Sequence, residues 1–325
     1  MESFLSASWL WFADLPQRLI AESPALLWVE CFVVGIALEL LFGDRNATPT
    51  ARAYATNLAH SLIYLGMIFL FTPAIWYATA RIRDLVGFDG LIDVQIVDNS
   101  TYVNQFVIYT IFLFLMDFFQ YWWHRAQHHF PVLWDQHVIH HSDEAISVTT
   151  ATRHHWTEFI LQAFTVRLPL TMLFKITPAN AGIVATLFGA LQFYLHSCLR
   201  VRLGPLSWLF SSPQMHRIHH SRLAGDRDKN FAAYFPIWDV IFGTYRAPVN
   251  DQFPPSGVEG IKHDTVLSLS IHPFVMWGNR LRKAIRASSR VKVVIYANAS
   301  IGTVVRAISC KRCSPLRFGH RASRG

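Results

Sequence analysis

The stretch Asp117–Ser142 decides the fold, and it reads DFFQYWWHRAQHHFPVLWDQHVIHHS. It places six histidines within eighteen residues, at the end of a strongly apolar segment. If the first part of this stretch is helical, His124 and His128 are four residues apart and project from the same face. Pro131 then interrupts the helical pattern. The stretch therefore predicts an apolar helix that ends in a pair of metal-ligating imidazoles.

Two further sets of histidines have the form HxxHH, which places three rings at neighbouring positions on one helical face. Burying so many imidazoles without a ligand would leave polar nitrogens unsatisfied. Imidazole suits zinc, copper, iron and nickel, whereas magnesium and calcium prefer oxygen ligands. Eight histidines are more than one ion needs, so the spacing predicts a site for two metal ions. The two HxxHH sets are His137, His140 and His141, and then His216, His219 and His220.

The composition is that of a membrane protein. Hydrophobic residues make up 52% of the 325 residues and charged residues only 15%, whereas about a quarter of the residues in soluble domains are charged. Much of the net charge of +8 comes from the segment Arg280–Gly325, which contains twelve Lys or Arg and no Asp or Glu. This tail either lies against anionic lipid or is a solvated end. It lacks the interleaved aromatic residues of a nucleic-acid-binding segment.

Apolar stretches of sufficient length predict three membrane-spanning helices, followed by a helical hairpin that enters the bilayer and returns to the same side. We expect one more membrane-associated helix after residue 260. His60, near the start of the second stretch, is expected to be a polar residue at the membrane interface. The predicted spans are Pro24–Phe42, Leu58–Ala80 and Val103–Trp123, and the hairpin covers Phe159–Ser197.

The predicted fold class is thus all-α, with about four to five membrane-embedded helices and a helical cap, facing the cytosol, that holds the metal site. Residues 1–23 are expected to be a lead-in. They have no basic region before their apolar residues and do not read as a cleaved signal peptide. Residues 24–246 are expected to form the membrane domain, with the histidine region at 117–246. Residues 247–325 are expected to form a C-terminal loop, the additional helix and the basic tail.

Between about Asp117 and Arg246 the sequence resembles the integral-membrane fatty acid hydroxylase and sterol desaturase superfamily. Within it, the resemblance is strongest to the branch that contains alkylglycerol monooxygenase and many bacterial relatives. The order and spacing of the matching residues carry the resemblance. They are Asp117, His124, Arg125, His128, Leu133, Trp134, His137, His140, His141, Ser142, Arg153, His196, Pro213, His216, Arg217, His219, His220, Ser221, Asn230, Phe231 and the segment WDVIFGTY at 238–245.

The resemblance adds candidates to the site. His196, in QFYLHS, matches the isolated ligand position of the superfamily, which makes nine expected ligands with the eight above. His155 lies where many bacterial relatives have histidine, so it is either a tenth ligand or an outer group. Ligand imidazoles commonly donate their second N–H to a carboxylate. Asp117 and Asp239 are expected to accept such bonds, with Asp135, Asp143 and Glu158 as further candidates.

The resemblance also implies a chemistry. Members of the superfamily use two non-haem iron ions and dioxygen to hydroxylate or desaturate lipid chains and sterols. Their electrons come from a reduced carrier or, in the alkylglycerol branch, from tetrahydrobiopterin. No cytochrome domain and no glycine fingerprint for a dinucleotide is found here. The expected partners are therefore a lipid substrate, the bilayer and a separate electron donor, with no nucleic acid.

Two other classes of protein fit parts of the pattern. A membrane metallohydrolase with two zinc ions would also cluster histidines, but the HExxH motif that supplies its general base is absent. A metal transporter would place ionisable residues midway through the bilayer, whereas these clusters lie at the ends of the predicted spans. A dependence on dioxygen would separate the oxygenase from both.

Overall fold

The computed structural model describes residues 24–87, 90–93, 102–175, 178–249, 252–261, 265–288, 293–296 and 304–307. The expected lead-in at 1–23 and most of the basic tail lie outside these residues. The chain divides into two compact units, Met1–His272 and Pro273–Gly325. The histidines and carboxylates named above all belong to the first unit.

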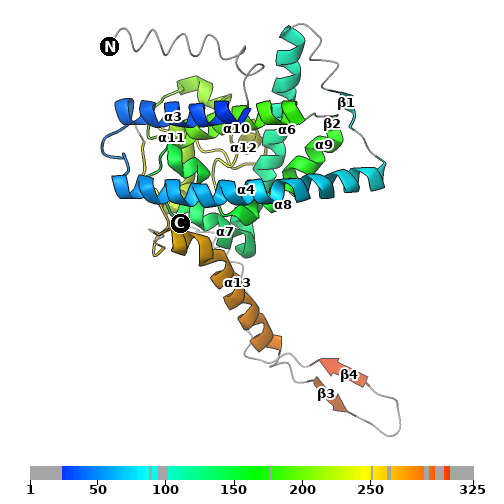
Figure 1. Cartoon of the computed structure of the whole chain (residues 1–325). Coiled ribbons are helices and arrows are strands. Elements are labelled where there is room, and N and C mark those ends of the chain that lie inside the picture. The colour runs from blue at the N-terminus through cyan, green and yellow to red at the C-terminus, as the bar shows by residue number, and fades with distance from the viewer. Residues whose placement is uncertain are drawn as a thin grey trace, which may run out of the picture. The chain divides into compact units, whose positions relative to one another are not determined.

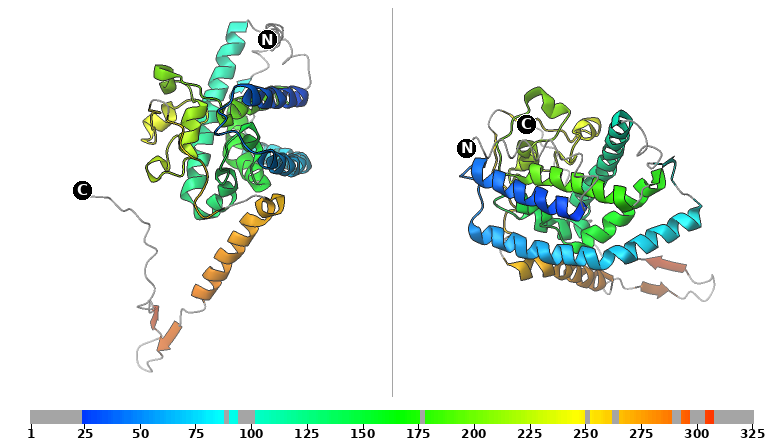
Figure 2. Two further views of the ribbon diagram at one scale, coloured as in Figure 1. Left: turned by 90° about the vertical axis from the view of Figure 1, so that its left-hand side faces the viewer. Right: turned by 45° about the horizontal axis from the view of Figure 1, so that its top comes forward.

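Helices dominate the first unit, as the sequence predicts. Figures 1 and 2 show α3 and α4 running roughly parallel across one side of this unit. α10 packs closely against α3. The longer helices are α3 (Pro24–Phe42), α4 (Ala51–Val86), α6 (Tyr102–His129), α7 (Pro131–His141) and α10 (Pro178–His196).

Among the described residues, α4 and the Phe106–His129 part of α6 are long and apolar enough to cross a membrane. α4 begins where the side chain of Thr50 accepts the N–H of Ala53, and it ends at Gly87, which takes a left-handed φ of 71°. Leu62 and Phe69 of α4 are 73% and 84% exposed. Such large exposed apolar side chains are typical of a surface that meets lipid.

Pro131 explains why the histidine stretch forms two helices. The residue before a proline is disfavoured in the α conformation, and Phe130 is extended, with φ −93° and ψ 116°. Proline itself is well suited to the first turn of a helix, because its missing N–H would have no partner there. α7 therefore starts at Pro131 in a new direction and packs back against α6.

The predicted hairpin is built from several short pieces before the chain returns along α10. α8 (Trp156–Gln162), the one-turn π-helix η2 (Ala163–Arg167) and α9 (Leu168–Leu173) lead to the break. Strand β2 (Phe174–Lys175) follows and pairs in parallel with β1 (Ile92–Asp93). These strands are only two residues long, so the prediction of a mostly helical fold is confirmed.

The cap is made of α7 and of short helices between loops: η1 (Val148–Thr152), η3 (Gly204–Trp208), α11 (Pro213–His219), η4 (Ala224–Asp226) and α12 (Ile237–Ile241). After it, α13 (Val266–Ser288) covers much of the range where a further helix was expected. In the second unit, β3 (Val293–Tyr296) and β4 (Val304–Ala307) pair in antiparallel fashion, which the sequence analysis did not predict.

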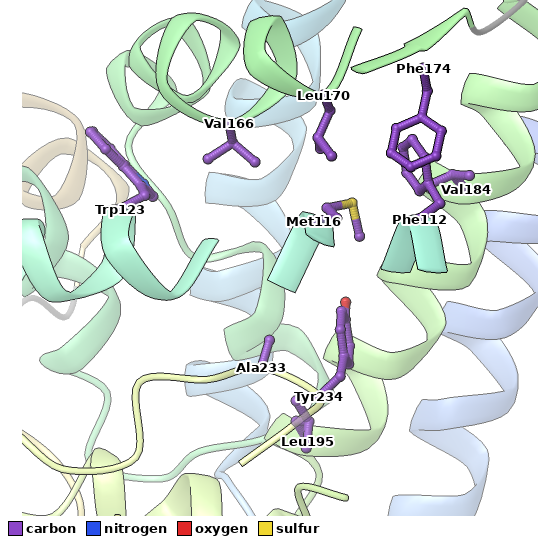
Figure 3. Packing of buried hydrophobic residues seen from close by; sticks show 10 residues of the cluster. All are labelled: Phe112, Met116, Trp123, Val166, Leu170, Phe174, Val184, Leu195, Ala233 and Tyr234. Atoms are coloured by element: carbon purple, nitrogen blue, oxygen red, sulfur yellow. The ribbon is translucent and has the colours of Figure 1, made fainter. Parts of the chain in front are cut away.

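The main apolar core lies where α6 meets η2, α9 and α10 (Figure 3). Burying one large apolar side chain contributes about 2 kcal/mol. The core thus fixes α6, the helix that carries the first two histidines, against the hairpin that carries His196. Its buried members are Phe112, Met116, Trp123, Val166, Leu170, Phe174, Val184, Leu195, Ala233 and Tyr234.

Candidate metal centre

The structure brings all nine expected ligands together, in two groups. Within each group the ligand nitrogens lie within 4.8 Å of one another. The five-histidine group consists of His124, His128, His137, His141 and His219. The four-histidine group consists of His140, His196, His216 and His220.

The helical spacing explains how each HxxHH motif serves both groups. On α7, His137 and His141 are one turn apart and face the five-histidine group, whereas His140 faces the four-histidine group. On α11 the division is reversed, because His216 and His220 share a group and His219 joins the other. Each motif therefore reaches both groups, which fixes the groups side by side.

Backbone carbonyls orient three of the rings. Nδ1 of His124 donates to the carbonyl of Phe231 (2.9 Å), and Nδ1 of His219 donates to that of Lys229 (2.7 Å). In the other group, Nδ1 of His196 donates to a carbonyl one turn earlier in α10 (2.8 Å). A neutral imidazole that donates through Nδ1 keeps a lone pair on Nε2. These three rings thus present Nε2 as a ligand atom.

The inward nitrogens converge. Nε2 of His140 lies 3.1 Å from Nε2 of His196, and Nε2 of His141 lies 3.1 Å from that of His128. Other buried nitrogens have no hydrogen-bond partner among the described residues: Nε2 of His124, Nε2 of His137, Nδ1 of His140 and both nitrogens of His220. Buried polar atoms without partners are costly. A set of converging, unsatisfied imidazole nitrogens is a donor set that fits transition-metal ions.

Burial keeps these imidazoles neutral. It lowers the pKa of His137 to about 4, although nearby Glu158 opposes the shift. For His216, His219 and His220, burial and then the neighbouring histidines lower the pKa well below its ordinary value. Neutral imidazole is the form that binds metal. The cap histidines are therefore ready to bind an ion at neutral pH without first losing a proton.

Two carboxylates lie against ligand rings of the five-histidine group. Nδ1 of His137 is 3.4 Å from Oε2 of Glu158, which is fully buried, and Nδ1 of His128 is 3.4 Å from Oδ1 of Asp228, which is 72% exposed. Burial alone would raise the pKa of Glu158, but His154 and His137 hold it well below its ordinary value. The Glu158 carboxylate is thus an ionised acceptor beside His137 of the five-histidine group.

Asp117 and Asp239 occupy different places from those expected. Asp117 accepts backbone N–H groups from Ala233, Tyr234 and Phe235. Asp239 accepts the hydroxyl of Thr244 and backbone N–H groups of residues 231 and 232. Their bonds among the described residues go to the 231–235 loop and not to an imidazole. They act on the site indirectly, because this loop supplies the carbonyl that orients His124.

His155 lies outside both groups. Its Nε2 donates to the carbonyl of Ser270 (3.1 Å), and its Nδ1 meets the hydroxyl of Thr157 (2.7 Å). The preceding residue, His154, instead lies over His140, with ring centroids 4.1 Å apart and ring planes 17° apart. His60, expected at the membrane interface, is buried and donates to the carbonyl of His154 (3.1 Å). That expectation is therefore wrong.

His154 and Asp228 were not among the predicted site residues, and Glu158 was only one of several candidate carboxylates. The sequence does contain a spacing signal for His154 and Glu158. His154 and Glu158 are four residues apart, the spacing of side chains that meet on a helix, and Nδ1 of His154 does lie 3.2 Å from Oε2 of Glu158. No spacing signal identified Asp228, which reaches His128 from a loop a hundred residues away.

Comparisons with known proteins agree with the resemblance. The family model for fatty acid hydroxylase matches residues 109–244. Alkylglycerol monooxygenase of Homo sapiens is 37% identical over 150 residues, which cover 46% of this chain and 33% of that protein. The Xenopus tropicalis alkylglycerol monooxygenase is 37% identical over 130 residues, or 40% of this chain and 28% of that protein.

A bacterial protein matches over a longer range. The ornithine lipid hydroxylase OlsE of Rhizobium tropici is 29% identical over 170 residues, which cover 52% of this chain and 50% of OlsE. The chain thus spans about a third of the length of the alkylglycerol monooxygenases and half of the length of OlsE. No solved structure matches. Residues 109–244, which contain all nine histidines of the two groups, match the fatty acid hydroxylase family, and over this range the chain is similar to alkylglycerol monooxygenases and to OlsE.

Proposed function

We propose that the protein is an oxygen-dependent membrane enzyme that hydroxylates a C–H bond of a lipid, with two iron ions held by the two histidine groups. The observation that carries the proposal is the convergence of nine imidazoles in two groups at the end of α6, a helix long and apolar enough to cross a membrane. Named relatives that hydroxylate lipids support the class of substrate.

In this proposal the five-histidine group holds one ion and the four-histidine group holds the other. All nine donors are imidazoles, so two divalent ions would keep most of their positive charge. Carboxylate-rich di-iron sites of soluble helical bundles differ in this respect. When bound, the two ions together with dioxygen supply the oxidising chemistry that breaks an unactivated C–H bond.

The reaction requires electrons from outside the chain. Hydroxylation of R–H consumes one dioxygen, two electrons and two protons, and it yields R–OH and one water. The electrons would come from a reduced carrier protein or a diffusible reductant such as tetrahydrobiopterin. Desaturation or ether cleavage would begin from the same hydrogen abstraction. Hydroxylation is preferred because it is the reaction in the name of OlsE.

The chain's own residues would hold the ions, orient the lipid and keep water out. His124 directly follows the buried core residue Trp123 on α6, so the apolar helix leads directly to the ligands. A lipid lying along α6 would thus be delivered to the site. Fatty acyl, sterol and alkylglycerol chains all fit this description.

The remaining apolar helices support a multi-pass arrangement. α3 carries exposed apolar side chains, among them Val33 (58%) and Leu40 (63%), and α10 packs beside it. We propose that α3, α4, α6 and the hairpin that ends in α10 are embedded in the bilayer. The histidine cap then lies on the cytosolic side, where reduced electron donors are available.

The metal content of detergent-purified protein tests the proposal. Protein expressed with ample iron should contain about two irons per chain, and His219→Ala should lose iron from the five-histidine group. Incubation of iron-loaded protein with lipid extracts and a reductant should then give hydroxylated products only when dioxygen is present. Zinc as the sole metal, together with an oxygen-independent hydrolysis, would favour the dizinc metallohydrolase instead.

A further inference from the structure

Glu158 contacts one histidine group and His154 contacts the other, and neither is among the nine proposed ligands. Glu158 is at the start of α8, with a side chain only 1% exposed, and His154 precedes that helix. Oε2 of Glu158 lies 3.4 Å from Nδ1 of His137 and 3.2 Å from Nδ1 of His154. An ionised carboxylate only accepts hydrogen bonds, so both imidazoles donate to it.

The two imidazoles connect the carboxylate to different groups. His137 belongs to the five-histidine group, and its Nε2 has no hydrogen-bond partner among the described residues. A bond from Nδ1 to Glu158 leaves that Nε2 with a lone pair for an ion. The ring of His154 is stacked on that of His140, at 4.1 Å between centroids. His140 belongs to the four-histidine group, so one carboxylate reaches both groups.

Other helices hold this pair in place. Gln127, on α6, donates from Nε2 to the same Oε2 of Glu158 (2.7 Å). His60, on α4, donates to the backbone carbonyl of His154 (3.1 Å). The pair is therefore fixed from α4 and α6, independently of the ligand histidines.

The ligand atoms of His137, His154 and Glu158 also lie within 4.8 Å of one another. These residues are nevertheless better described as a hydrogen-bonded set that supports the two groups than as a third metal position. Nδ1 of His137 and Nδ1 of His154 both carry the protons that bind Glu158, so neither offers a lone pair to an ion. The Nε2 of His137 is already directed to the five-histidine group.

We infer that Glu158 is a positioning residue for both metal positions. It orients His137 directly and holds the ring of His140 through His154. The inference rests on the proposed two-ion site and not on the oxygenation reaction. Outer partners of this kind typically change metal affinity by about 10- to 100-fold when removed.

Titration of the metal-stripped full-length protein with Co²⁺ tests the inference, because cobalt absorption reports the ligand field without any turnover. Glu158→Gln keeps the size of the side chain but removes the negative charge that both imidazoles face at Oε2. We expect it to weaken both cobalt-binding steps by about 10- to 100-fold and to shift both absorption bands. His154→Ala should weaken one step only and leave the step assigned to His137 unchanged.

Glu144→Gln is the matched control, because Glu144 is 51% exposed and its carboxylate faces Arg222 at 3.6 Å. It should bind cobalt as the unmodified protein does. If Glu158→Gln is folded and binds both ions with unchanged affinity and spectrum, the inference is wrong. If Glu158→Gln does not fold, the cobalt titration of His154→Ala tests the inference instead. Unchanged cobalt binding by His154→Ala, or an equal weakening of both cobalt-binding steps, would overturn the inference. Failure of the unmodified protein to bind cobalt would contradict the proposed function itself.

Discussion

Nε2 of His140 and Nε2 of His196 face each other at 3.1 Å, although 56 positions separate them in the sequence. His140 is on α7 in the cap and His196 is the last residue of α10. The apolar hairpin therefore delivers a ligand to the same group that the cap supplies. This contact makes the four-histidine group dependent on how α10 returns to the cap.

His196→Ala should accordingly reduce the iron content from about two to about one per chain, because only the four-histidine group loses a donor. His129→Ala is the control. His129 lies on the same stretch as His128 but belongs to neither group and is exposed. Metal analysis of the two purified variants measures the difference. Equal iron content in both would contradict a role of His196 as a ligand.

Asp117→Asn should destabilise the protein. The Asp117 carboxylate accepts backbone N–H groups from three successive residues, Ala233 to Phe235, at distances of 2.8 to 3.2 Å. The amide replaces one acceptor oxygen with a donor, which leaves buried N–H groups unsatisfied. The expected cost is about 3 kcal/mol, measured by thermal denaturation in detergent.

Asp84→Asn provides the comparison, because Asp84 is 66% exposed and lies 3.5 Å from Arg81, one turn earlier in α4. Its effect should be below about 1 kcal/mol. Since the 231–235 loop orients His124, Asp117→Asn should also weaken metal binding, whereas Asp84→Asn should not. A stable Asp117→Asn variant with full metal content would show that the loop does not depend on this carboxylate.

Mildly acidic solution should destabilise the metal-stripped protein. Burial lowers the pKa of His137 to about 4 and holds those of His216, His219 and His220 well below their ordinary value. The unfolded chain takes up protons near pH 6.5, whereas the folded protein does not. The stability that these groups provide is therefore complete above pH 6.5 and is lost as the pH falls below it.

Each such histidine contributes a slope of up to about 1.4 kcal/mol per pH unit in this range. The denaturation temperature of metal-stripped protein, measured between pH 7.5 and 5, should fall steeply below pH 6.5. His129→Ala is the control, because that exposed residue belongs to neither histidine group. A flat profile would mean that the histidine groups are protonated in the folded protein.

Helical spacing alone was enough to predict the histidine-rich cap. HxxxH and HxxHH place their rings on single helical faces, and the structure brings these rings together. Spacing alone did not predict which histidines of different helices share a group, because that also depends on how α7 turns back against α6 after Pro131. α3 and α4 also occupy the predicted apolar stretches, since long apolar runs favour helices.

Contacts between distant segments could not be predicted. Asp117 was expected to face an imidazole, but its partners are backbone groups 116 to 118 positions away. The resemblance pointed to His155, but the nitrogens of His155 lie against Thr157 and Ser270. It is the ring of His154 that lies over His140.

Gly189→Leu should weaken the packing of α10 on α3. A Cβ at Gly189 would collide with the indole of Trp28, on α3, so the helices can approach this closely only because the residue is glycine. Separating them would also displace His196, seven residues further along α10. We therefore expect a loss of about 2 kcal/mol of stability together with weaker metal binding at the four-histidine group.

Gly66→Ala, in α4, is the control because a Cβ there has nothing within 4 Å among the described residues. Alanine also favours a helix by about 1 kcal/mol over glycine. Thermal denaturation and cobalt titration of both variants should show the difference in stability and in metal binding. A Gly189→Leu variant as stable as Gly66→Ala would show that α3 and α10 can move apart without a loss of folding free energy.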